Sequence, residues 1–141
     1  MKYFIVFMVS IVLSACGNKS GGDQSSGTTE QTEAQSYQIY FDDIDIEKAK
    51  ALINQNKDLV LLDVRTPGEI AQGKISDAIE MDLQDAAFSQ NLDALDKDKE
   101  YLVYCAVGGR SATAMEMMKS KGFKKVHNLA GGYSAWYMDA K

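Results

Sequence analysis

The feature that most constrains the fold is an apolar run that ends at a cysteine and continues into a glycine-containing loop. The run covers residues 101–104, and Cys105 follows it directly. Two glycines, an arginine and a serine come next, and then a segment rich in alanine and methionine. A short apolar run, a Gly-Gly pair and a helical pattern together predict a buried strand, a tight loop and a helix. Residues 105–111 are called the cysteine loop below.

Cys105 is a candidate nucleophile because the loop after it favours a reactive thiol. Gly108 and Gly109 allow the positive φ angles that a sharp turn requires, and no proline in the loop removes a backbone donor. N–H groups that converge near a helix N-terminus stabilise an anion, so we expect a lowered pKa for the Cys105 thiol. A lone cysteine at a strand end is more often a small buried hydrophobe. The Gly-Gly-Arg-Ser sequence favours the reactive interpretation, because an inert core cysteine needs no anion-binding loop.

The composition describes one modest domain. The 141 residues are 45% hydrophobic, which supports a core, and the formal net charge is −5. Because binding to nucleic acid requires a basic surface, this charge argues against a nucleic-acid partner. An anionic substrate must be attracted locally, by Arg110 and the loop backbone, since the field of the whole protein repels it.

The first 15 residues have the organisation of a signal peptide. Lys2 supplies a positive charge, and residues 3–13 form an apolar run that is too short to span a membrane. A buried N-terminal helix is disfavoured because a polar stretch follows. The sequence Leu-Ser-Ala-Cys16 resembles the cleavage site of bacterial lipoproteins, which implies removal of residues 1–15 and lipidation of Cys16. Residues 16–36 lack large apolar side chains and predict a flexible tether.

Lipidation of Cys16 has two further consequences. Gly17 replaces the aspartate that resembles an inner-membrane retention signal in some bacteria, which favours a periplasm-facing position on the outer membrane. Cys16 and Cys105 are the only cysteines, so a lipidated Cys16 leaves no partner for a disulfide or a resolving thiol, and no Cys-rich zinc site. We expect an exported, membrane-anchored monomer.

Strand and helix patterns alternate from residue 37 to the C-terminus. Asp45 and Thr66 are expected to cap the helices after the first two strands, and Glu69 completes a capping box with Thr66. Ser111 is expected to cap the helix after the cysteine loop. The expected strands are 37–41, 59–64, 78–81, 101–104 and 125–129. The alternation predicts one α/β domain, residues 37–141, built on a parallel sheet.

Asp63 and Arg65 lie at the end of the 59–64 run. In open parallel sheets, functional sites lie beyond the carboxyl ends of the strands. We expect Asp63 to organise the neighbouring loop through hydrogen bonds. Arg65 is either a structural ion-pair partner or a contact at the rim of the site. Arg110 either holds an anionic substrate or braces the cysteine loop, and the sequence leaves both roles open.

Three ordered motifs resemble the rhodanese family of sulfurtransferases. The cysteine loop resembles the active-site loop of that family, and Asp63-Val-Arg65, with Glu69 and Gly73, matches upstream of it. Leu-Ala-Gly-Gly-Tyr-Ser-Ala-Trp136 matches downstream. The resemblance implies a rhodanese-like three-layer sandwich, in which helices flank a central parallel sheet of about five strands.

The resemblance also implies a mechanism. The Cys105 thiolate attacks the outer sulfur of a donor such as thiosulfate, forms a persulfide and passes the sulfur to cyanide or a thiol. No metal and no other cofactor is required. The family usually has His, Gly and Asn where this chain has Lys74, Asp77 and Glu80, and these departures affect the rim of the site rather than the loop. The substrate-binding loop residues are Ala106, Val107, Gly108, Gly109, Arg110 and Ser111.

Two other functions stay open. Phosphatases and arsenate reductases use a Cys-x5-Arg loop, one residue longer than the loop from Cys105 to Arg110, and the shorter ring suits sulfur better than phosphate. A membrane-tethered persulfide carrier or docking module would turn over slowly without its partner. His127, the single histidine, would suggest a Cys–His protease, but it lies within a predicted strand.

Overall fold

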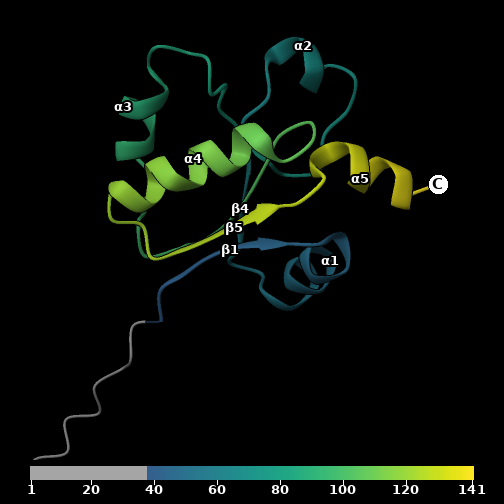
Figure 1. Ribbon diagram of the computed structural model, residues 1–141, viewed down its shortest axis with the longest axis horizontal. Helices are drawn as coiled ribbons and strands as arrows, with labels where there is room; N and C mark the ends of the chain where they lie inside the picture. Colours follow the sequence, from purple (N-terminus) through teal and green to yellow (C-terminus); the bar gives the residue numbers. More distant parts are fainter. Residues whose placement is uncertain (1–37) are drawn as a thin grey trace, which may run out of the picture. The chain divides into compact units, whose positions relative to one another are not determined.

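The computed structural model describes residues 38–141, and this part of the chain forms a three-layer α/β domain (Figure 1). Its strands pair in parallel, in the order β1-β5-β4-β2-β3. They are β1 Tyr40–Ile44, β2 Val60–Asp63, β3 Ile79–Glu80, β4 Glu100–Tyr104 and β5 Lys125–Leu129. The helices are α1 Ile46–Gln55, α2 Pro67–Ile70, α3 Phe88–Asp93, α4 Gly109–Ser120 and α5 Gly132–Asp139. The predicted α/β fold with a five-stranded parallel sheet is confirmed.

The predicted signal peptide, the lipidated Cys16 and the tether of residues 16–36 lie outside the described residues. Between residues 38 and 141, none of the helices has the length and apolar character needed to cross a membrane.

Helices cover both faces of the sheet. Figure 1 shows α3 and α4 on one side of the strands and α1 on the other. Two separate apolar cores result, because each face of the sheet packs against its own helices. The first core joins the sheet to α3 and α4 through Phe88, Leu92, Ala114, Met115 and Met118. The second joins it to α1 and α5 through Ile46, Ala49, Leu52, Ile53, Tyr133 and Trp136.

Strand β4 lies in the middle of the sheet, between β5 and β2. Its last four side chains, Tyr101, Leu102, Val103 and Tyr104, are each no more than 1% exposed. They alternate between the two cores: Tyr101 and Val103 belong to the first, Leu102 and Tyr104 to the second. A strand covered on both faces requires such a continuous apolar run. The cysteine loop therefore begins at the carboxyl end of a rigid, buried strand.

The two edge strands differ slightly from the prediction. β1 begins at Tyr40 rather than at residue 37, because it pairs with β5 and Lys125, the first residue of β5, lies opposite Tyr40. β3 is confined to Ile79 and Glu80, which pair with the end of β2.

Two predicted caps are confirmed and one is wrong. The Asp45 side chain accepts a hydrogen bond from the Lys48 amide at the start of α1, and Thr66 and Glu69 form the predicted capping box of α2. Ser111 does not cap α4. Gly108 is the N-cap, with φ of +100°, and Ser111 lies within the first turn. The left-handed conformation of Gly108 turns the chain into the helix earlier than the sequence suggested.

Candidate active site

The candidate site lies at the carboxyl ends of the central strands. Cys105 follows β4 directly, and Asp63 ends the adjacent strand β2. The Cys105 side chain is buried, 1% exposed, and also contributes to the first apolar core. Burial alone is what an inert core cysteine would show, so the polar groups around the sulfur decide its character.

Hydrogen-bond donors of the cysteine loop converge on the Cys105 sulfur. The Gly108 amide donates to Sγ over 3.1 Å. The Ser111 hydroxyl lies 3.5 Å from Sγ and 3.0 Å from the Gly108 carbonyl oxygen, and its one proton can go to either. Burial raises the pKa of the Cys105 thiol, but hydrogen bonds from the Ser111 hydroxyl and from the amides of Ser111, Val107 and Gly108 outweigh burial and leave the pKa below its usual value. The site thus favours a thiolate.

Backbone amides at the start of α5 hold the carbonyl groups at the start of the cysteine loop. The Tyr133 amide donates to the Cys105 carbonyl oxygen over 2.7 Å, and the Ser134 amide donates to the Ala106 carbonyl oxygen over 3.0 Å. Gly132 makes this approach possible, because a Cβ there would lie 2.4 Å from the Cys105 carbonyl oxygen, and its φ is +58°. With its carbonyls held by α5, the loop can turn its amides toward the sulfur.

Arg110 is bound by a carboxylate of α2. Its Nη1 donates to Glu69 Oε2 over 2.8 Å and its Nη2 to Glu69 Oε1 over 2.5 Å. The hydrogen bonds and charge of Glu69 hold the pKa of Arg110 above its usual value. Of the two roles that the sequence left open for Arg110, this contact fits loop bracing, because Nη1 and Nη2 each donate to one oxygen of Glu69.

Asp63 and Arg65 form a second, buried pair. Arg65 Nε donates to Asp63 Oδ1 over 2.9 Å and Nη2 donates to Oδ2 over 2.6 Å, and the Arg65 amide also donates to Oδ1. Nη2 further donates to the Gly73 carbonyl oxygen. The Arg65 guanidinium lies 4.1 Å from the centre of the Tyr133 ring. The pair therefore links β2 to the turn after α2 and to α5. These contacts fit the expected loop-organising role of Asp63 and, of the two roles left open for Arg65, the structural one.

The most exposed side chain of the cysteine loop is apolar. Val107, at 69% exposure, is the most exposed large apolar side chain among the described residues. Ala106 precedes it and is half-buried. Arg110 is the only charged side chain in the loop.

Sequence reasoning missed the partners that join the three motifs. Glu69 was assigned to the capping box and to the upstream motif, but not to Arg110. Gly132 and Tyr133 were noted only as part of the downstream motif, although they also hold the cysteine loop and Arg65. Tyr104 was assigned only to the core, but its hydroxyl accepts from the Ile75 amide over 3.2 Å. The one available signal was that Glu69 and Arg110 match the same family.

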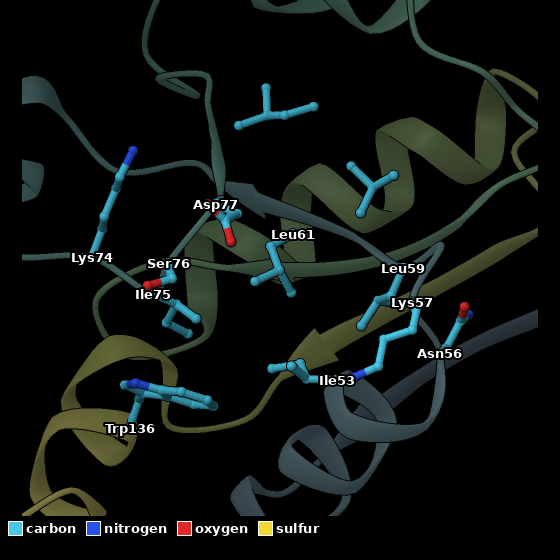
Figure 2. Close-up of a pocket in the computed structure, with 12 residues that line it drawn as sticks. Ile53, Asn56, Lys57, Leu59, Leu61, Lys74, Ile75, Ser76, Asp77 and Trp136 are labelled. Carbon is cyan, nitrogen blue, oxygen red and sulfur yellow. The ribbon is translucent and has the colours of Figure 1, made fainter.

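Two other features lie apart from this site. The ring nitrogens of His127 contact Asp42 and Glu100, so the side chain serves the sheet rather than Cys105. A cavity of about 530 Å³ lies among α1, β2, residues 74–79 and α5 (Figure 2). Its lining includes Ile53, Lys57, Leu61, Lys74, Ile75 and Trp136, and no residue of the cysteine loop.

A parallel α/β sheet with a cysteine loop at the end of its central strand is characteristic of one class of protein, and comparison with known families identifies that class. The model of the rhodanese-like domain matches residues 45–139, and the chain belongs to this family. The predicted family membership is thus confirmed.

Individual relatives agree with the family. A sulfurtransferase of Allochromatium vinosum is 35% identical over 94 residues, which cover 67% of this chain and 86% of that protein. The thiosulfate sulfurtransferase GlpE of Coxiella burnetii is 30% identical over 82 residues, 58% of this chain and 75% of that protein. The crystal structure of a rhodanese-like domain protein from Staphylococcus aureus superposes with a TM-score of 0.61 at 30% identity, over 68% of this chain and 91% of that one. A sulfurtransferase-like enzyme, with a sulfur donor and a thiol acceptor as partners, is what this family implies.

Proposed function

We propose that this protein is a sulfurtransferase that moves a sulfane sulfur from a donor such as thiosulfate to cyanide or a thiol through a Cys105 persulfide. The observation that carries the proposal is the set of donors aimed at the Cys105 sulfur: the Gly108 amide at 3.1 Å and the Ser111 hydroxyl at 3.5 Å. These groups stabilise a thiolate before the reaction and the negatively charged persulfide after it.

The first half-reaction loads the enzyme. The Cys105 thiolate attacks the outer sulfur of thiosulfate, a sulfur–sulfur bond to Cys105 forms, and the bond to the sulfonate sulfur breaks. Sulfite leaves with the electron pair of that bond, and the negative charge of the thiolate moves to the terminal sulfur of the persulfide. The amides of Val107, Gly108 and Ser111, which lower the thiol pKa, are positioned to stabilise that charge as an oxyanion hole does.

The second half-reaction returns the enzyme to its starting state. Cyanide or a thiolate attacks the terminal sulfur, and the Cys105 thiolate is released as the leaving group. A thiolate with a lowered pKa leaves readily, so the donor groups that activate Cys105 in the first half-reaction also assist the second.

Turnover of thiosulfate with cyanide tests the proposal. Wild-type protein should produce thiocyanate, and Cys105→Ser should reduce the rate to that of the uncatalysed reaction, since an alcohol at this position has no thiolate to carry sulfur. After incubation with donor alone, intact mass should show the gain of one sulfur atom in wild type and none in the variant.

Two results would replace the proposal with another function. A single sulfur loaded onto Cys105 without multiple turnover would identify a persulfide carrier that requires its own partner. Hydrolysis of a phosphate monoester that depends on Cys105, without any sulfur loading, would identify a phosphatase.

We also propose that the protein acts at a membrane, exported and anchored by lipid on Cys16 with the domain facing the periplasm. The sequence before Cys16 supports this proposal. Full-length protein expressed in a Gram-negative bacterium should incorporate labelled palmitate and sediment with membranes. Cys16→Ser should lose both properties, and an unlabelled wild-type protein in the soluble fraction would contradict the anchor.

A further inference from the structure

The charges beside the cysteine loop are already paired with carboxylates. Arg110, the loop's only cation, donates to both oxygens of Glu69. Asp82 also lies close enough to contribute to the raised pKa of Arg110. Arg65 is committed to Asp63 and is only 3% exposed. Among the described residues, the cysteine loop therefore presents amides and apolar side chains to a donor, but no uncommitted guanidinium.

Glu69 is held firmly in the position that engages Arg110. Besides the two bonds from Arg110, its Oε2 accepts from the Thr66 amide over 3.0 Å and from the Thr66 hydroxyl over 2.8 Å. The Arg110 hydrogen bond, with help from Thr66, lowers the pKa of Glu69 to about 2. The carboxylate is thus ionised at neutral pH, and the capping box fixes it against α2.

The paired Arg110 matters because sulfur donors differ in charge. Thiosulfate carries two negative charges at neutral pH, whereas an alkyl persulfide carries at most one. Both donors end in a single sulfane sulfur, so the buried position of Cys105 does not favour one donor over the other. A dianion approaching this loop meets a neutralised arginine, an exposed Val107 and a protein of net charge −5.

We propose that Glu69 is a positioning residue that withholds Arg110 from the donor, so that the cysteine loop favours alkyl persulfides over small dianionic donors such as thiosulfate. The inference rests on the proposed sulfurtransferase function and specifies its donor class. In the favoured reaction, the Cys105 thiolate attacks the terminal sulfur of R–S–SH and forms Cys105–S–SH. The carbon-bound sulfur leaves as the thiolate R–S⁻ with the electron pair of the broken bond, and the proton stays on the transferred sulfur.

The Glu69→Gln variant tests this role by releasing Arg110. Glutamine still suits the capping box, because its amide oxygen accepts from Thr66, but it no longer provides a carboxylate for the guanidinium. The readout is the rate of sulfur loading onto Cys105, followed by intact mass, with thiosulfate and with 2-hydroxyethyl persulfide generated in situ. We expect the ratio of the thiosulfate rate to the persulfide rate to rise by about fivefold to tenfold, as a charge-assisted contact to the dianion becomes available.

Two control variants separate this effect from changes in net charge or folding. Asp93→Asn removes an equal charge from the Lys121–Asp93 pair, at the opposite end of α4 from the cysteine loop, and should leave the ratio unchanged. The double variant Glu69→Gln/Arg110→Gln should return the ratio to the wild-type value. A structural role of Glu69 would lower both loading rates together and leave their ratio unchanged, a result that would overturn the proposal.

The unmodified protein provides an independent measurement. If Arg110 is withheld, the acidic protein repels thiosulfate, and salt should raise the thiosulfate loading rate by screening that repulsion. If Arg110 binds the donor, salt should lower the rate, and the proposal fails even if Glu69→Gln does not fold. Wild-type protein that loads sulfur from neither donor would instead overturn the proposed function itself.

Discussion

The two arginine–carboxylate pairs of this site are chemically alike but differ in their surroundings. In the Asp63–Arg65 pair the side chains are 0% and 3% exposed, whereas in the Glu69–Arg110 pair they are 35% and 27% exposed. Arg65 has further partners in the Gly73 carbonyl and the Tyr133 ring. Arg110, in the first turn of α4, is paired with the carboxylate of Glu69 in α2.

This difference assigns the two pairs to different tasks. A buried ion must keep all its partners, since loss of one leaves an uncompensated charge away from water. The Asp63–Arg65 pair therefore acts as part of the frame between β2, the turn at Gly73 and α5. A half-exposed pair costs little to break, because water replaces the lost partner. The Glu69–Arg110 pair can therefore be changed, and its effect on the substrate altered, with little loss of stability.

Arg65→Met should produce the largest effect on stability. The substitution leaves the Asp63 carboxylate buried without its guanidinium, and we expect the free energy of unfolding to fall by about 3–5 kcal/mol. Urea denaturation, followed by the signal of the single tryptophan, Trp136, measures the change.

The matched substitution Arg110→Met is the control for this prediction. It leaves Glu69 at the surface with its Thr66 hydrogen bonds intact, so the loss of stability should stay within about 1 kcal/mol. Equal losses for the two methionine variants would show that burial does not distinguish the pairs.

The sequence predicted the frame of the fold well, for physical reasons visible in particular segments. The run 101–104 is apolar on both faces, which identified the central strand and placed Cys105 at its end. Capping at Asp45 and Thr66 depends on residues three positions apart, so local sequence determines it. These features require no knowledge of what lies across the domain.

The contacts that complete the site could not be predicted in the same way. Glu69 and Arg110 are 41 residues apart in sequence, and only the folded chain brings α2 beside α4. The error at Ser111 has a similar origin: the N-cap of the helix is Gly108, a left-handed residue whose backbone packs against Leu129 and Gly131 of another motif. The loop amides point toward the Cys105 sulfur, as expected from the turn that Gly108 and Gly109 allow. The amides of α5 that hold the loop were not predicted.

Acid titration of Glu69 should produce the smallest effect and gives the sharpest contrast between the pairs. The folded-state pKa of Glu69 is about 2, below the value of an unfolded glutamate, so its ionised form contributes stability above pH ~4.3. That contribution is lost as pH falls from ~4.3 through about 2, where Glu69 becomes protonated in the folded protein as well. Because the side chain is 35% exposed, solvent screening limits the contribution to at most about 1 kcal/mol.

The difference in unfolding free energy between wild type and Glu69→Gln isolates this contribution. Urea denaturation at intervals from pH 6 to pH 2 should show a small advantage for wild type at pH 6 that shrinks to zero near pH 2, and that is smaller in high salt. An advantage several times larger, or one that persists at pH 2, would mean that Glu69 belongs to the frame in the same sense as Asp63. In that case the Glu69–Arg110 pair could not set the preference for a sulfur donor independently of the fold, because any substitution in the pair would alter the cysteine loop itself.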